Sequence, residues 1–201
     1  MSLRPFALIA IALITVALVG CGGNPRHVVA SPLVTAPPPG KALINFVYDH
    51  GSEKDQSIHN EKKEILFLVA PNTVHQLVIT PGTQDFFIMS PVGGILNLPG
   101  LDSVIRIHAV AGRIYDVELE RNFLTNFTLT VPAHPGTKQH NEIAGLLTTL
   151  QTVGPVDRSI PDIQEREQKY APRVETSLQK WRENPDVKPT AEMQAMDSRT
   201  P

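Results

Sequence analysis

Apolar and polar residues alternate with a period of two through the middle of the chain, and this period is typical of β-strands. The segment RIYDVELE at 113–120 shows it most clearly, because Tyr115, Val117 and Leu119 fall on one side and three acidic residues fall on the other. We therefore expect a strand there with a solvated acidic face. Seven segments have this pattern or a short apolar run: KALINFVY, EILFLVA, VHQLVIT, DFFIMS, SVIRIHAV, RIYDVELE and FTLTV.

Turn-forming residues separate these segments, among them Pro81-Gly82 and Gly112. Pro81 presets its φ for the first corner of a tight turn and Gly82 accepts a positive φ at the second, so two strands are expected to reverse there. Seven short strands without helices between them predict a mainly β fold over residues 41–153, namely an antiparallel Ig-like β-sandwich. The polar stretch 49–63 is expected to be a long loop.

Two later segments have the spacing of helices. Apolar residues three and four apart at 141–153 favour a short helix on the sandwich, although Gly145 weakens this prediction and a final strand remains the alternative. Residues 154–183 predict an amphipathic helical extension, in which Pro172 is expected to cause a kink or to divide two shorter helices. The tail at 184–201 contains three prolines and no apolar period, so it is expected to be disordered.

The helical extension carries one apolar stripe, formed by Ile163, Tyr170, Val174, Leu178 and Trp181. Such a stripe either packs back on the sandwich or binds another protein. Because the sandwich has enough apolar residues for its own core, the second interpretation is slightly favoured. The candidate partner-binding residues are Tyr170, Val174, Leu178 and Trp181, with the two aromatic rings as anchors.

The amino-terminal segment has the layout of a secretory signal. Arg4 supplies positive charge, an apolar run of about 14 residues at 6–19 follows, and small residues come next. This run is too short to span a bilayer, which needs about 20 residues. The only cysteine of the chain, Cys21, stands immediately after it. A plain signal peptide or a membrane helix with an incidental cysteine is the alternative interpretation.

The sequence LVGC at 18–21 resembles the lipobox of bacterial lipoproteins. This resemblance implies a signal peptide at 1–20, cleavage before Cys21, and acylation of its thiol and new amino terminus. Gly22 stands where lipoproteins retained in the inner membrane generally have Asp, so the resemblance implies the outer membrane, facing the periplasm. Residues 21–40 are rich in proline and are expected to form an extended tether of up to roughly 60 Å.

Composition limits the remaining function classes. A net charge of −2 over 201 residues provides no basic field for nucleic acid, and one cysteine excludes internal disulfides and cysteine-cluster zinc sites. The seven histidines show no metal-binding spacing, and the motifs of nucleophile elbows, phosphate loops and dinucleotide sites are absent from the mature chain. We therefore expect no catalytic residues, no metal site and no cofactor.

Two further stretches, VITPGTQDFFI at 78–88 and IHAVAGRIYDVELE at 107–120, resemble the small sandwich domains typified by PEGA and DUF2846. The resemblance implies a sandwich without catalytic residues. Three hypotheses follow from the sequence. The first is a lipid-anchored, non-enzymatic module that binds another envelope protein or has a structural role. The second is a small-ligand carrier or sensor, which requires an unfilled pocket, and the third is an enzyme, which requires convergent titratable residues.

Overall fold

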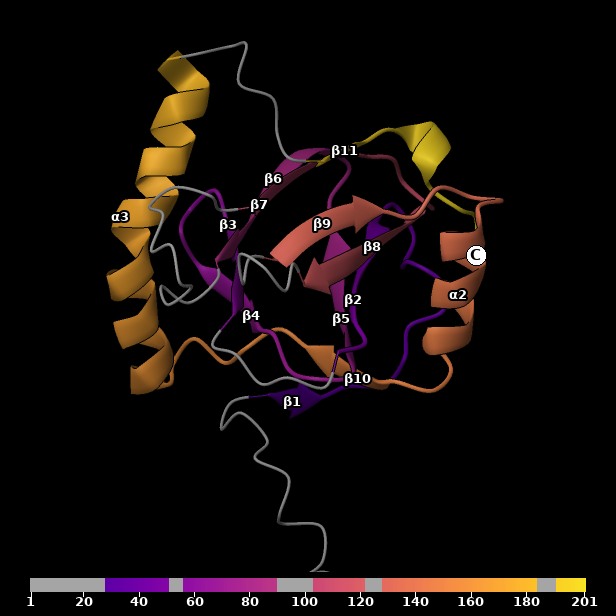
Figure 1. Ribbon diagram of the computed structural model, residues 1–201, viewed down its shortest axis with the longest axis horizontal. Helices are drawn as coiled ribbons and strands as arrows, with labels where there is room; N and C mark the ends of the chain where they lie inside the picture. The colour runs from indigo at the N-terminus through magenta and orange to yellow at the C-terminus, as the bar shows by residue number, and fades with distance from the viewer. Residues whose placement is uncertain (1–27, 51–55, 90–102, 122–127, 184–190) are drawn as a thin grey trace, which may run out of the picture.

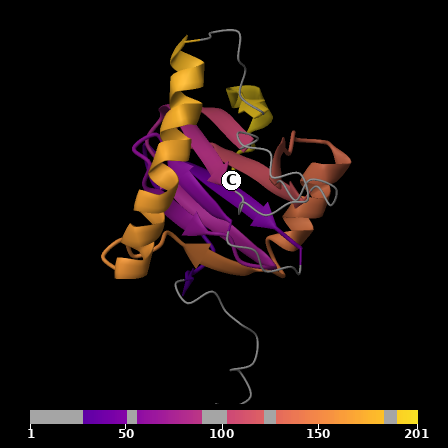
Figure 2. The same cartoon turned by 60° about the vertical axis from the view of Figure 1, so that its left-hand side comes forward.

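The computed structural model describes residues 28–50, 56–89, 103–121, 128–183 and 191–201. Two β-sheets pack face to face, and one α-helix covers part of the outer face of each sheet (Figures 1 and 2). The mainly β fold with two sheets is therefore confirmed. Within the described residues, neither helix is long and apolar enough to cross a bilayer.

Sheet A has six strands and sheet B has five. In spatial order, sheet A consists of β1 (Val29–Ala30), β10 (Gln151–Gly154), β5 (Thr73–Ile79), β2 (Ala42–Tyr48), β8 (Ile114–Arg121) and β9 (Thr128–Pro132). Sheet B consists of β11 (Ala191–Met193), β7 (Ser103–Ala109), β6 (Gly82–Met89), β3 (Ser57–Asn60) and β4 (Ile65–Leu68).

Each of the seven predicted segments contains a strand, but the described residues form eleven strands in all. The additional strands are β1, β3, β10 and β11, of which β3 lies in the stretch expected to be a loop. The antiparallel prediction is wrong for three pairs, because β2–β8, β10–β5 and β11–β7 are parallel. The two strands of each parallel pair are far apart in sequence. This separation is needed because two parallel strands can be joined only by a long crossover connection.

The core lies between the two sheets. Alternate residues of β2 face it, as predicted, and Phe46 of β2 meets Phe86 of β6 edge to face with ring centroids 5.5 Å apart. The opposite face of β2 is buried as well, because Val47 packs with Ile143 of helix α2 (Lys138–Leu146). Burial on both faces explains why the strand is apolar at nearly every position.

The predicted turns join the two sheets instead of closing hairpins. Pro81-Gly82 leads from β5 in sheet A to β6 in sheet B, and Gly112 lies between β7 in sheet B and β8 in sheet A. Both glycines have positive φ, +128° and +76°, so the expected backbone chemistry is present. The strands on either side of each turn nevertheless pair with other neighbours, because the chain changes sheet there.

Residues 141–153 were predicted to form a short helix or a final strand, and they contain parts of both, because helix α2 (Lys138–Leu146) is followed by strand β10. Thr137 caps the helix by accepting a hydrogen bond from the His140 N–H at 3.2 Å. Ile143 then packs on the outer face of sheet A. The apolar residues at the end of the segment continue into β10, where Val153 is buried.

Helix α3 (Pro161–Glu183) is a single helix with Pro172 inside it, so the division into two shorter helices is wrong. The tail prediction is also wrong over its described part. Ala191 and Met193 are buried in β11, which is followed by a short 3-10 helix (Ala195–Asp197). The pairing of β11 with β7 supplies the order that the local sequence lacks.

Of the predicted tether at 21–40, residues 28–40 belong to the folded domain, and residues 21–27 lie outside the described residues. Strand β1 pairs with β10, and the Ser31 N–H donates to the Thr152 carbonyl at 2.9 Å. Farther on, the Val34 N–H donates to Gln76 Oε1 at 2.7 Å. A proline-rich segment was expected to stay extended and free, but these hydrogen bonds fix it to sheet A.

Candidate functional site

The predicted functional residues divide into three groups. Cys21 lies outside the described residues. Tyr170 and Val174 are buried on sheet B, whereas Leu178 and Trp181 belong to α3 but their side chains lie outside the described part. The candidate site that the structure describes is therefore the interface between α3 and the outer face of sheet B.

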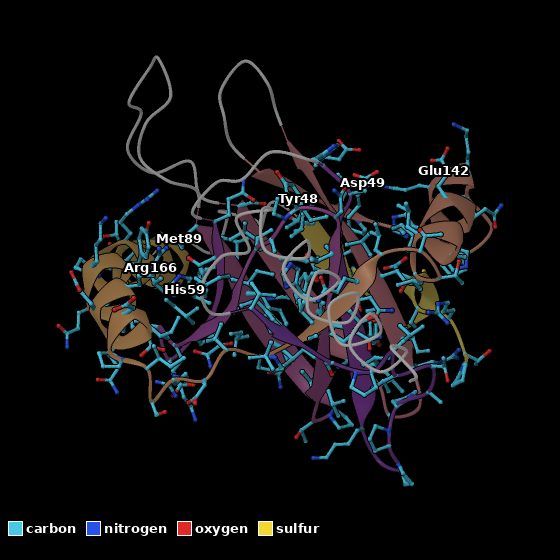
Figure 3. The ribbon with its side chains drawn as sticks, turned by 90° about the horizontal axis from the view of Figure 1, so that it is seen from below. Tyr48, Asp49, His59, Met89, Glu142 and Arg166 are labelled. Atoms are coloured by element: carbon cyan, nitrogen blue, oxygen red, sulfur yellow. The ribbon has the colours of Figure 1, made fainter. Side chains whose placement is uncertain are left out.

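The stripe of α3 packs on the sandwich in two clusters. Tyr170 and Val174 contact Phe87 and Met89 of β6 and Val104 of β7, while Ile163 packs with Ile65 and Leu68 of β4. Figure 3 shows Met89 and His59 beneath this helix and Glu142 of α2 at the far side of the molecule. This placement favours the interpretation that the helix folds back, and in this conformation Tyr170 and Val174 are not accessible to a partner.

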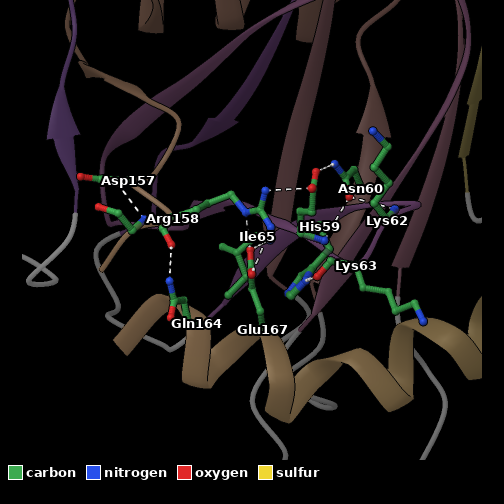
Figure 4. Close-up of polar contacts among 11 residues, drawn as sticks. His59, Asn60, Lys62, Lys63, Ile65, Asp157, Arg158, Gln164 and Glu167 are labelled. Atoms are coloured by element: carbon green, nitrogen blue, oxygen red, sulfur yellow. Dashed lines mark hydrogen bonds and ion pairs between the residues drawn. The ribbon is translucent and has the colours of Figure 1, made fainter. Parts of the chain in front are cut away.

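A polar network ties the first half of α3 to strand β4 (Figure 4). Glu167 Oε1 accepts hydrogen bonds from the Ile65 backbone N–H at 2.9 Å and from Arg158 Nε at 2.7 Å. Arg158 also donates to Glu64 at 2.8 Å. Burial raises the pKa of Glu167, but the hydrogen bonds from Arg158 and Ile65 together outweigh it, and the net pKa is lowered.

Glu167 also provides a hydrogen-bond acceptor for the backbone at the edge of sheet B. Strand β4 is the last strand of sheet B, and an edge strand presents backbone donors that need partners. The carboxylate of Glu167 satisfies the Ile65 donor, and Lys63 pairs with Glu175 farther along the helix at 2.7 Å. The helix therefore covers the edge as well as the apolar face.

His59 lies fully buried beneath α3. Its ring contacts Tyr170 edge to face at 5.8 Å, and Ser57 Oγ lies 2.8 Å from Nε2. Nδ1 lies 3.4 Å from the Lys63 carbonyl, which can only accept, so the contacts assign the proton to Nδ1 and make Nε2 the acceptor of the Ser57 hydroxyl. Burial is the main cause that lowers the pKa of His59, to about 4.

A second hydroxyl–histidine pair lies in sheet A and has the opposite arrangement. Thr73 Oγ1 donates to the Ala70 carbonyl at 2.7 Å, so it can only accept from His75 Nε2 at 2.8 Å. The ring of His75 packs on Phe67 in the core, and burial lowers its pKa to about 3. Both histidines are therefore neutral at pH 7.

The Ser57–His59 pair has the donor arrangement of a hydroxyl activated by a base, but its surroundings do not suit catalysis. Ser57 is 1% exposed and His59 is 0% exposed, so a substrate has no access to either while α3 is in place. Among the described residues, no three His, Cys, Asp or Glu side chains are placed to hold a metal ion. The pair works as a buried hydrogen bond that satisfies both side chains.

A depression of about 340 Å³ lies along α3. It is lined by Asp162, Glu165, Arg166, Lys169 and Tyr170, which are residues at helical spacing. Two acidic and two basic side chains give it no net charge. Its walls are polar, unlike the apolar pocket that the small-ligand hypothesis requires.

A second polar network crosses the outer face of sheet A. Asp116 is 2% exposed and accepts from Asn45 Nδ2 at 2.6 Å and from Arg199 Nε at 2.7 Å. Asn45 Oδ1 in turn accepts from Gln76 Nε2 at 2.8 Å, and Gln76 also binds the backbone of Val34. This chain of hydrogen bonds holds the amino-terminal segment and the tail on one sheet.

Burial of Asp116 contradicts the solvated acidic face expected for 113–120. The alternation itself is confirmed, because Tyr115, Val117 and Leu119 are all buried in the core. Alternation identifies which side of a strand faces the core, but it carries no information about a distant segment that covers the other side. Ser57, His59 and Glu167 were missed for the same reason, and SIHN at 57–60, with Ile58 as its one apolar residue, has no alternation that would predict β3.

Comparison with protein-family models, curated proteins and solved structures finds no match for the chain.

Proposed function

We propose that this protein is a lipid-anchored, non-enzymatic β-sandwich module of the bacterial cell envelope, which binds another envelope protein or has a structural role. One observation carries the proposal. The single cysteine, Cys21, follows an apolar run of signal length, and residues 22–27 separate it from the described residues, which begin at Val28. An acylated Cys21 would hold the domain at the membrane, since each buried methylene contributes about 0.8 kcal/mol.

The test of the anchor is mass spectrometry of the wild type and of Cys21→Ala, both purified from bacterial membranes. The proposal expects a mature wild-type chain that begins at an acylated Cys21, and an uncleaved, unacylated variant. A second variant, Gly22→Asp, is expected to move the protein from the outer to the inner membrane fraction. An unmodified mature chain in the wild type would overturn the proposal.

Because one face of α3 is buried on sheet B, only part of this helix is available to bind a partner. Tyr170 and Val174 can contact a partner only if α3 leaves sheet B, whereas Leu178 and Trp181 belong to the last turns of the helix. Trp181→Ala is therefore assayed twice, for thermal stability and for recovery of a cross-linked envelope partner. If Trp181 binds a partner, we expect the variant to recover less of the cross-linked partner while its thermal stability is unchanged. A lower melting temperature with unchanged recovery would mean that this end of the helix completes the fold.

The immunoglobulin-like class also remains part of this proposal. The support is Tyr115, whose hydroxyl donates to the His108 carbonyl at 3.0 Å and accepts from the Val110 N–H at 3.0 Å, closing the corner between the sheets. Tyrosines that bond back to the backbone a few residues upstream occur at such corners of immunoglobulin-like sandwiches. The parallel pairs in both sheets depart from that pattern.

A small-ligand role is the second candidate. Because charged side chains line the depression on α3 in place of an apolar wall, its ligand would be a small zwitterionic molecule and not an apolar one. Isothermal titration with amino acids tests it, with Lys169→Ala as the variant that removes one cation. Heat of binding that Lys169→Ala abolishes would favour this role over the first.

A further inference from the structure

The point at which the chain joins the fold lies at one lateral edge of the sandwich. Strand β1 is the first strand of sheet A, next to β10, and the segment that follows β10 leads to the start of α3. Figure 1 shows β1 and β10 at the bottom, β9 above them near the middle, and β11 and the 3-10 helix at the top. The β1 edge is defined here as β1, β10 and residues 31–34.

The chain between Cys21 and Val28 sets how far this edge can lie from the anchor. Seven residue steps span at most about 25 Å even when fully extended. The six strands of sheet A give five spacings of about 4.8 Å, so the opposite edge at β9 lies about 24 Å beyond the β1 edge. The connection therefore keeps the β1 edge within about 25 Å of the attachment point, and the exposed side chains of the domain decide which edge faces the lipid.

The side chains of the β1 edge suit the boundary between water and lipid. Val29 is 51% exposed and Leu33 is 40% exposed, and both belong to the segment nearest to Cys21. Val78 of neighbouring β5 is also 41% exposed on the outer face of sheet A. At the opposite edge, by contrast, Glu192 and Asp197 carry negative charge, which anionic lipid repels.

We propose that the β1 edge lies against the lipid surface, with Val29 and Leu33 in contact with the headgroup region. The proposal rests on the anchor at Cys21 proposed above, and it adds a fixed orientation. The sandwich then stands on this edge, so that β9, β11 and the 3-10 helix point away from the membrane. A partner protein or a second copy of the chain on the β1 edge is the competing occupant.

The single native cysteine makes this orientation measurable. Once Cys21 is acylated, an introduced cysteine is the only free thiol of the protein. The variants are Val29→Cys and Leu33→Cys at the β1 edge, with Met196→Cys, which is 83% exposed in the 3-10 helix, as the matched control. Each lipidated variant is labelled with a nitroxide and placed in phosphatidylethanolamine–phosphatidylglycerol vesicles that contain a nickel-chelating lipid, at fewer than one protein per vesicle.

The expected result is a relaxation enhancement by the nickel lipid that is at least fivefold larger at positions 29 and 33 than at 196. Equal enhancement at all three positions, in protein that floats with the vesicles, would overturn the orientation and leave the anchor intact. Protein that does not float would instead overturn the anchor. Protection of positions 29 and 33 from both nickel lipid and aqueous nickel, together with a cross-linked dimer, would identify a second copy as the occupant and refute the proposal.

Discussion

Arg199 Nε donates a hydrogen bond to Asp116 Oδ2 at 2.7 Å, and this contact fixes the tail on the central part of sheet A. Asp116 belongs to β8, and the backbone of Arg199 also pairs with Ile114 at the start of the same strand. This ion pair adds to the pairing of β11 with β7, and together they order a segment without apolar periodicity. The contact also explains why an acidic residue is stable under the tail, since a buried charge needs a partner.

Asp116→Ala is expected to lower the free energy of unfolding by about 3 kcal/mol, because it leaves Arg199 and Asn45 without their acceptor. Urea denaturation measures the change. Glu120→Ala removes an exposed carboxylate four residues away on the same side of the strand, and its effect is expected to stay within about 0.5 kcal/mol. Equal losses for the two variants would contradict the burial of Asp116.

Tyr115→Phe is expected to cost about 1 to 2 kcal/mol while leaving the core packing unchanged. The variant removes only the hydroxyl that bridges the His108 carbonyl and the Val110 N–H across the corner. Amide hydrogen exchange should then rise at residues 108–112, in addition to the lower melting temperature. Unchanged exchange in this corner would show that the hydroxyl has no role in closing it.

Val174→Ala is expected to lower the stability by about 2 kcal/mol, because Val174 is fully buried against Phe87 and Met89. Gln168→Ala, on the exposed side of the same helix, is the matched control and is expected to have little effect. Thermal unfolding of both variants tests whether α3 belongs to the cooperative fold. A melting temperature unaffected by Val174→Ala would mean that the helix is detached from sheet B in solution.

Stability is expected to fall as the pH drops from about 6.5 to about 4. The pKa values of His59 and His75 are lowered to about 4 and about 3, so the unfolded chain binds more protons than the native one in this range. For His59, a shift of about 2.5 units corresponds to a loss on the order of 3 kcal/mol. Glu167 approaches His59 and favours its protonation, whereas Arg173 opposes it.

Urea midpoints at pH 7, 6, 5 and 4 measure this dependence. His75→Leu is expected to make it shallower, because one buried titrating group is removed and the Thr73 hydroxyl still donates to Ala70. Gln168→Ala alters an exposed side chain that does not titrate and is expected to leave the slope unchanged. A slope that His75→Leu does not alter would show that His75 is not the source of the proton uptake.

The pattern of apolar and polar residues predicts the positions of those strands that have one buried side. The alternation in RIYDVELE identified Tyr115, Val117 and Leu119 as core residues, and the structure confirms all three. The positive φ of Gly82 and the helix over most of 154–183 were likewise predictable, because turn chemistry and helical periodicity are local properties.

The pairing of the strands, and the segments that cover their outer faces, depend on contacts between distant parts of the chain. Local sequence does not indicate that the turn at Gly112 changes sheet, that β2 pairs in parallel with β8, or that the tail joins β7. The same holds for Asp116 and His59, which look like surface residues until Arg199 and Tyr170 are placed over them. Burial depends on partners more than 80 residues away in both cases, and a periodic pattern reports only the environment of its own segment.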